Sequence, residues 1–255
     1  MTPALPDAFL QTPIAHRALH DKTKNRPENS RAAIRAAVEA GYGIEIDLQL
    51  TSDNRAMAFH DYDLKRLTGQ PGPIRQITAE QARATPLLHA EDGIPTLDEV
   101  LDIVGGRVPL LIELKDQDGA MGPNVGALEA DTVRALKGYD GPVALMSFNP
   151  NSVSELVRLA PDLPRGIVTC AYRPEVELLP AAVCDHLRGI PDFDRVGASF
   201  ISHEAADLSR PRVAELKAQG VPILCWTIRS PGQEAEARKV ANNVTFEGYL
   251  AAQPA

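Results

Sequence analysis

The chain has 255 residues, of which 44% are hydrophobic, and its formal net charge is −8. This composition suffices for a substantial core in one large or two small domains, and the acidic balance argues against a general binder of nucleic acid or anionic membranes. The three cysteines are far apart and lack metal-site spacing, which indicates free thiols in a reducing compartment. No stretch resembles a secretory signal or reaches the length of a membrane span, so we expect a cytoplasmic protein without stable membrane insertion.

Short apolar runs of strand type alternate with amphipathic stretches of helix type along the chain. The predicted strands are 13–17, 43–50, 57–60, 108–115, 142–148, 165–170, 196–202, 221–228 and 243–249. The clearest helical stretches are 30–41, 96–106, 125–138 and 209–220, and several begin with Ser or Thr and end with Gly, as helix caps prefer. This alternation predicts parallel strands joined by helical crossovers.

The link between the strands 43–50 and 57–60 determines how the nine predicted strands are arranged. It is too short for a parallel crossover, which needs a dozen or more residues, so the segment 57–60 returns as the antiparallel arm of a hairpin. Eight parallel strands remain, and a length near 250 residues then predicts an α/β fold of the (β/α)₈ TIM-barrel type. A doubly wound open sheet is the alternative, and the absence of a Gly-rich phosphate loop after the first strand argues against it.

The strand 43–50 places two carboxylates on one face. Its residues alternate strictly, with Glu45 and Asp47 on the polar side. If Asp53 and Asn54 form a two-residue turn, paired positions in the hairpin sum to about 107. His60 is then expected roughly opposite Asp47, to within about one residue, so a histidine and two carboxylates would share a small volume.

Polar side chains also end two other predicted strands. His16 and Arg17 end the first strand, and Glu113 and Lys115 end the strand 108–115, two positions apart and therefore on one face. The carboxyl ends of barrel strands meet at one mouth, where barrel enzymes keep their chemistry. We therefore expect these side chains to share one site with the hairpin carboxylates.

The acidic members of this group predict a metal site. Glu45, Asp47 and Glu113 offer only oxygen ligands, which is the set that a hard divalent cation such as Mg²⁺ or Ca²⁺ prefers. Zinc is disfavoured because the sequence has no compact set of His and Cys ligands.

The basic members suit a phosphate ester. Arg17 can bind phosphate through its planar fork and Lys115 as a point charge. His16 and His60 could act as a general acid and base, a function that typically contributes roughly 100- to 10,000-fold to a rate. Together with a metal ion, these groups predict displacement at phosphorus.

Two further residues at this mouth are assigned to substrate binding. Glu28 ends the loop after the first strand, and Trp226 lies near the end of a late strand.

Each polar residue also has a structural interpretation when taken alone, as a hydrogen-bonded histidine, a solvated strand face, an ion pair or a helix cap. Five separate segments place their polar residues at one end of the barrel, and this favours a functional site over the separate structural interpretations. The other histidines are interpreted as surface residues: His20, His89, His186 and His203.

Several short motifs follow one another in a fixed order between about residues 14 and 249: AHR, PENS, GYGIEIDLQLTSDNRAMAFHD, DLKRLTG, IPTLDEVL, LLIELK, MSF and CWTI. In these motifs and their order the sequence resembles the glycerophosphodiester phosphodiesterase family. The resemblance implies one barrel domain over residues 1–255 that hydrolyses small-molecule glycerophosphodiesters to glycerol 3-phosphate and an alcohol with a divalent metal. It implies that His16 and His60 form the acid–base pair. Arg17 and Lys115 would then bind the phosphate, and the metal ligands would be Glu45, Asp47 and Glu113.

The resemblance also implies an insertion, roughly residues 61–107, that caps the active site. It further implies that the glycerol 2-hydroxyl attacks phosphorus to give a cyclic phosphate.

The sequence departs from the family's usual pattern in three places. Ala18 replaces the usual Gly after His-Arg, where its methyl group is expected to narrow the site slightly. The following loop is long and basic, and the last strand reads ANNVTFEGYLA, so no catalytic role is assigned to Glu247.

Two other functions remain open at this point. One is a phospholipase D-like lyase or a sugar-phosphodiester hydrolase on the same barrel, which the released alcohol and any lasting cyclic product would distinguish. The other is a non-catalytic binding protein for a phosphorylated polyol, which would be expected to lose one of His16, His60 or Glu113. The head group, the choice between Mg²⁺ and Ca²⁺, and the oligomeric state are left undetermined.

Overall fold

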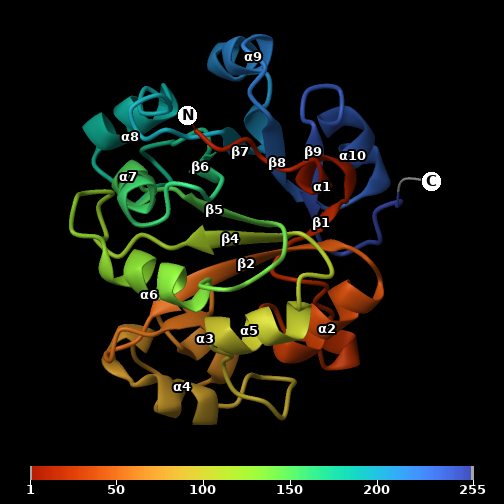
Figure 1. Ribbon diagram of the computed structural model, residues 1–255, viewed down its shortest axis with the longest axis vertical. Helices are drawn as coiled ribbons and strands as arrows, with labels where there is room; N and C mark the ends of the chain where they lie inside the picture. The colour runs from red at the N-terminus through yellow and green to blue at the C-terminus, as the bar shows by residue number, and fades with distance from the viewer. Residues whose placement is uncertain (1, 254–255) are drawn as a thin grey trace.

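A computed structural model describes residues 2–253 and contains the predicted barrel (Figure 1). Eight parallel strands close on themselves, because β1 pairs with both β2 and β9, and the antiparallel β3 lies outside β2. This closure excludes the open doubly wound sheet. The strands are β1 (Ile14–Ala15), β2 (Gly43–Leu50), β3 (Ala56–Ala58), β4 (Leu110–Leu114), β5 (Val143–Ser147), β6 (Arg165–Thr169), β7 (Phe200–Glu204), β8 (Ile223–Ile228) and β9 (Asn243–Phe246).

Helices surround the strands, and α3 and α4 lie beyond α5 at the lower edge of the view (Figure 1). The α-helices are α1 (Ala8–Gln11), α2 (Arg31–Glu39), α3 (Lys65–Thr68), α4 (Ala79–Ala84), α5 (Leu97–Val104), α6 (Ala127–Ala135), α7 (Pro150–Leu159), α8 (Ala181–Arg188), α9 (Pro211–Ala218) and α10 (Pro231–Ala237). Short 3₁₀ turns are η1 (Lys22–Lys24), η2 (Ile74–Gln76) and η3 (Ala205–Asp207). Within residues 2–253, no helix combines the length and apolar character that crossing a membrane requires.

Apolar side chains fill the inside of the barrel below its mouth. One buried cluster takes its members from six of the parallel strands, and α1 adds Phe9 from the amino end. The filling is tight on one side, since a Cβ atom at Gly166 would lie 2.4 Å from the Phe200 ring. Successive inward positions on a strand therefore pass from this packed floor to the polar mouth.

The hairpin differs from the expectation by one residue. Leu48 pairs with Ala58 and Leu50 with Ala56, so paired positions sum to 106 rather than 107. The connection has three residues, and Asn54 adopts a left-handed conformation with φ of 58°, which Asn tolerates better than most residues. The predicted two-residue turn is therefore wrong. As a result, the Phe59 N–H donates to the Asp47 carbonyl at 2.9 Å, and His60 follows one position later.

The seventh parallel strand also begins later than expected. The predicted strand 196–202 is observed at Phe200–Glu204, because Gly197 has a φ of 55° and ends a turn before it. His203 therefore lies on β7, where it is fully buried and contacts the Thr169 hydroxyl at 2.7 Å. Its interpretation as a surface residue is wrong.

The segment after the hairpin forms its own small hydrophobic cluster beside β3. The helix α5 at the end of this segment packs instead against α2, as a crossover helix of the barrel does. The cluster contains Met57, Phe59, Leu64, Leu67, Ile74, Ala82, Leu87 and Ile94.

Candidate active site

A cavity of about 160 Å³ opens at the carboxyl ends of the strands. Seven of its lining residues lie on seven different parallel strands, β2 and β4 to β9, which explains why no single motif describes the cavity. Apolar side chains form one wall and charged side chains the other. The lining residues are His16, Arg17, Glu45, His60, Glu113, Lys115, Met146, Phe148, Val168, Ser202, Trp226 and Thr245.

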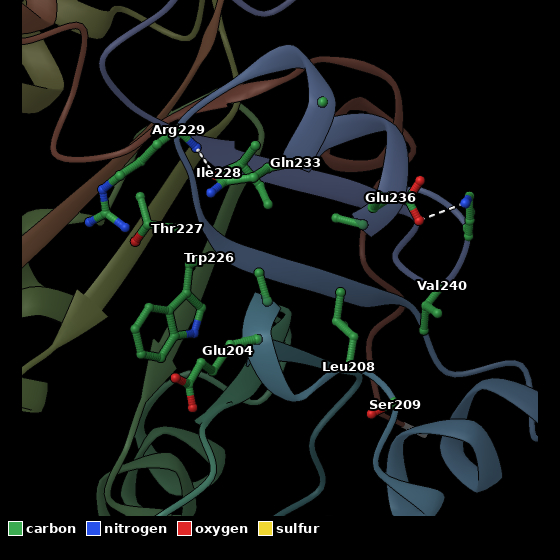
Figure 2. Close-up of a pocket in the computed structure, with 15 residues that line it drawn as sticks. Glu204, Leu208, Ser209, Trp226, Thr227, Ile228, Arg229, Gln233, Glu236 and Val240 are labelled. Atoms are coloured by element: carbon green, nitrogen blue, oxygen red, sulfur yellow. Dashed lines mark hydrogen bonds and ion pairs between the residues drawn. The ribbon is translucent and has the colours of Figure 1, made fainter. Parts of the chain in front are cut away.

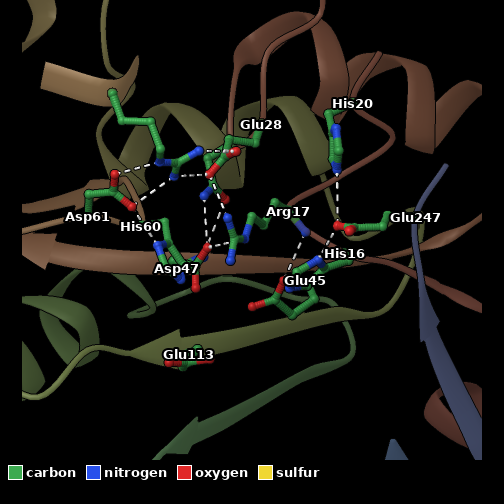
Figure 3. A network of polar contacts seen from close by, with 12 residues as sticks. His16, Arg17, His20, Glu28, Glu45, Asp47, His60, Asp61, Glu113 and Glu247 are labelled. Carbon is green, nitrogen blue, oxygen red and sulfur yellow. Dashed lines mark hydrogen bonds and ion pairs between the residues drawn. The ribbon is translucent and has the colours of Figure 1, made fainter. Parts of the chain in front are cut away.

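The three predicted carboxylates meet at this mouth (Figure 3). Glu45, Asp47 and Glu113 are buried, and one oxygen of each lies within 4.8 Å of the others. Lys115 neutralises part of this charge, since its Nζ atom lies 2.7 Å from Asp47 Oδ1 and 2.6 Å from Glu113 Oε1. Asp47 is also fixed by the Asn29 amide, which donates to its Oδ2 at 2.9 Å.

The protonation behaviour of these carboxylates fits a site for a cation. Burial, followed by the charges of Asp47 and Glu113, raises the pKa of Glu45 well above its usual value. Burial alone would also raise the pKa of Asp47, but Lys115 and the other nearby cationic groups outweigh it and lower that pKa. The buried Glu45 Oε1 has no hydrogen-bond partner. An unpaired oxygen among three clustered carboxylates suits a hard divalent cation, so the donor set fits Mg²⁺ or Ca²⁺.

Arg17 is held at the mouth by both its backbone and its side chain. Its N–H donates to Glu45 Oε2 at 2.8 Å, and its guanidinium donates to Glu28 Oε1 at 2.8 Å. Arg17 and Ala18 both have left-handed backbones, with φ of 53° and 64°. Ala18 is not among the residues that line the cavity. The conformation explains why Gly would suit this position better.

Glu28 lies behind the cavity rather than in its lining. Its carboxylate accepts hydrogen bonds from Arg17 and, at 2.7 and 2.8 Å, from Arg66 of α3. Burial would raise its pKa, but these guanidinium groups outweigh that effect and lower it. Glu28 therefore acts in this structure as the support of Arg17.

His16 is oriented by a carboxylate from the last strand. Its Nδ1 atom lies 2.6 Å from Glu247 Oε2, which leaves Nε2 as its other ring nitrogen (Figure 3). Burial lowers the pKa of His16, and the Glu247 contact opposes that effect. The same contact lowers the pKa of Glu247, whose other oxygen accepts from Arg229 at 2.8 Å. His20 is half-buried, with its Nε2 atom 3.5 Å from Glu247.

His60 has a corresponding arrangement on the other side of the carboxylates. Its Nδ1 atom lies 2.7 Å from Asp61 Oδ1, and Arg66 donates to Asp61 at 2.6 Å. Burial would raise the pKa of Asp61, but the hydrogen bonds from His60 and Arg66 lower it. Each histidine of the cavity is thus held at Nδ1 by a carboxylate that a guanidinium group neutralises.

Trp226 separates the cavity from a larger groove. Its indole N–H donates to the Ser202 carbonyl at 3.0 Å, and its ring packs edge-on against Phe148. The groove, of about 850 Å³, lies on the other side of Trp226 between β8, the residues after β7 and α10 (Figure 2). Trp226 therefore forms a wall of both spaces.

All three expected metal ligands and both expected histidines lie near one another, but the groups that hold the histidines were not predicted. Asp61 follows His60 directly, so the His-Asp pair was a usable signal. Glu247 has no predicted catalytic role, because the sequence of its strand departs from the family's usual pattern. Its position at the end of the last parallel strand was the signal that could have identified it.

A closed (β/α)₈ barrel with buried carboxylates, two cations and two oriented histidines at its mouth defines an enzyme site for a phosphate ester. The model of the glycerophosphoryl diester phosphodiesterase family matches residues 16–248. The chain therefore belongs to this family of enzymes.

Named relatives agree with this assignment. A glycerophosphodiester phosphodiesterase of Caldanaerobacter subterraneus is 32% identical over 164 residues, which is 61% of this chain and 65% of that protein. One from Bacillus altitudinis is 29% identical over 164 residues, with the same shares. An Oleispira antarctica phosphodiesterase, solved with the product sn-glycerol-3-phosphate, has a TM-score of 0.75 and 24% identity, with 94% of each chain covered. This structural match supports the fold.

Proposed function

We propose that this protein hydrolyses glycerophosphodiesters to glycerol 3-phosphate and an alcohol, with a divalent metal ion and two histidines. The observation that carries the proposal is the pair of carboxylate-held histidines, His16 and His60, in one cavity with the buried acidic cluster. The family and the names of the relatives support the substrate class.

Glu45, Asp47 and Glu113 would hold the metal ion. When bound, Mg²⁺ or Ca²⁺ would supply positive charge that polarises and orients a phosphate group. Lys115 and Arg17 line the same cavity, and both keep their charge throughout the physiological range. These two cations bind the non-bridging phosphate oxygens and stabilise the charge that develops on them.

The two histidines move the protons of the reaction. Because Nδ1 of each imidazole contacts a carboxylate, the ring carries a proton on Nδ1. Its Nε2 atom is then available to the substrate. One imidazole accepts the proton of the attacking oxygen, which belongs either to water or to the glycerol 2-hydroxyl group. The other, as imidazolium, donates a proton to the alcohol oxygen as the phosphorus–oxygen bond to the head group breaks. Attack by the glycerol hydroxyl gives a cyclic phosphate, which water then opens to glycerol 3-phosphate while the two imidazoles exchange roles.

The proposal also includes the organisation of the chain. Residues 1–255 act as one catalytic domain, and the insertion after the hairpin caps the site. Contacts of its first residues support this role, since Arg66 holds Glu28 and Asp61, and the Tyr62 hydroxyl donates to the Asp116 carbonyl at 2.7 Å. A cytoplasmic location rests on the three buried cysteines, which are unpaired in the described chain.

Product analysis tests the reaction class. The protein would be incubated with choline, ethanolamine, glycerol and inositol diesters of glycerol 3-phosphate in the presence of Mg²⁺ or Ca²⁺, and the products separated by chromatography. We expect glycerol 3-phosphate together with the free head-group alcohol. A phosphorylated head group, a lasting cyclic phosphate or no product from folded, metal-loaded protein would contradict the proposal.

A further inference from the structure

Unpaired buried polar atoms concentrate in the active-site cavity. In residues 2–253, seven buried side-chain nitrogen or oxygen atoms lack a hydrogen-bond partner. Four of them belong to residues that line this one cavity: Arg17, Glu45, Ser202 and Thr245. A buried polar group without a partner destabilises the folded chain, so such a concentration indicates a ligand that completes the hydrogen bonds.

The proposed function accounts for only two of these four atoms. Glu45 Oε1 is expected on the metal ion and the Arg17 guanidinium on the phosphate. The Ser202 and Thr245 hydroxyls have no part in either interaction. Both are deeply buried, with Ser202 0% and Thr245 1% exposed.

The topology brings these two hydroxyls to one part of the cavity. Ser202 lies on β7 and Thr245 on β9, and both strands pair with β8, which carries Trp226 between them. The Trp226 indole is anchored to the Ser202 carbonyl at 3.0 Å. The remaining wall consists of the apolar side chains of Met146, Phe148 and Val168. This part of the cavity thus offers two hydroxyl groups on an otherwise apolar surface.

This combination matches one end of a short polyol. A hydroxyl side chain both donates and accepts a hydrogen bond, which is what an alcohol group of a ligand also needs. Apolar and aromatic side chains pack against the C–H surface of such a ligand, while a few placed polar groups fix its orientation. A charged head group such as choline would find no opposite charge on Ser202, Thr245 or the apolar wall.

We infer that Ser202 and Thr245 bind the free hydroxyl groups of the glycerol moiety and thereby select the polyol half of the substrate. This inference rests on the proposed function, since the phosphate must be held by the cations and the metal ion. The alcohol that leaves then lies on the open side of the cavity. The two residues are specificity-determining and take no part in proton transfer.

Calorimetric titration of the metal-loaded protein tests the inference without turnover. Two ligands are compared: glycerol 3-phosphate, and propyl phosphate, which lacks both hydroxyl groups. We expect the wild type to bind glycerol 3-phosphate more tightly by about tenfold or more. Ser202→Ala and Thr245→Val should each weaken its binding by about fivefold, the effect of losing one hydrogen bond of about 1 kcal/mol. Binding of propyl phosphate should change by less than about twofold.

Two further variants complete the test. Thr132→Val removes a buried hydroxyl in α6, which donates to the Leu128 carbonyl outside the cavity, and should leave both affinities unchanged. Thr245→Ser keeps the hydroxyl and should keep the preference, even if Thr245→Val does not fold.

Equal affinity of the wild type for both ligands would overturn the inference. So would an unchanged preference in Ser202→Ala and Thr245→Val, because the hydroxyls would then bind water only. Failure of the wild type to bind either ligand would overturn the inference together with the proposed function.

Discussion

Replacing Glu247 by Gln tests how His16 is held. The substitution keeps the size of the side chain but removes the negative charge that lies 2.6 Å from His16 Nδ1. An amide can also donate to Nδ1, which would place the imidazole proton on Nε2 and exchange the donor and acceptor roles of the two ring nitrogens. We therefore expect turnover to fall by about 100-fold or more, which is the lower end of what general acid–base catalysis contributes.

The charge change also predicts a shift in pH dependence. Burial lowers the pKa of His16, while Glu247 and the Coulomb effect of Asp47 raise it and Arg17 lowers it further. Removing Glu247 takes away a raising contribution, so the pKa of His16 must fall. An opposite charge at contact typically shifts a pKa by roughly 1–3 units. Arg229 at 2.7 Å already neutralises part of the Glu247 charge, which limits the size of this fall.

The assay is kcat/KM for glycerol 3-phosphate release between pH 5 and pH 9, measured for the wild type and Glu247→Gln. The limb of the pH profile that reports the pKa of His16 should move to lower pH in Glu247→Gln. Glu236→Gln is the matched control, because Glu236 is exposed and pairs with Lys239 away from the cavity. A Glu247→Gln profile with the wild-type limbs and wild-type rate would refute the orientation of His16 by Glu247.

Three further changes give separate checks. His60→Ala should leave fold and metal binding largely intact but reduce kcat by at least about 100-fold; retained activity would remove His60 from the mechanism. Glu45→Gln should weaken metal binding and activity together, because one of three anionic ligands becomes neutral, and a normal calorimetric metal titration would remove Glu45 from the ligand set. Ala18→Gly should raise the free energy of unfolding in urea by about 0.5–1 kcal/mol, since Gly adopts the φ of 64° without strain; a loss of stability would contradict the strain argument.

Much of the fold could be predicted because its signals are local. The short link after β2 excluded a parallel crossover, and the caps at Ser30 and Thr96 marked helix starts that the structure has at the expected places. The residue-level errors came from backbone conformations that depend on tertiary context. Asn54 and Gly197 adopt left-handed conformations that lengthen a turn and delay a strand.

The site could be predicted only where short motifs carry it. Glu45 with Asp47, and Glu113 with Lys115, are two apart on strands, so strand geometry alone places each pair on one face. The partners of the histidines were harder to find. His16 and Glu247 are 231 positions apart, and only closure of β1 against β9 brings them together. Ser202 and Thr245 gave no signal, because an unpaired buried hydroxyl can be recognised only in a folded structure.

The most direct test of the account is the effect of metal removal on glycerol 3-phosphate release. The wild-type protein would be treated with a chelator, freed of it and assayed before and after Mg²⁺ or Ca²⁺ is restored. We expect release to stop without metal and to return with it, because the site then lacks the positive charge that a cation on the three buried carboxylates would supply to the phosphate. Full turnover in the presence of chelator would contradict it.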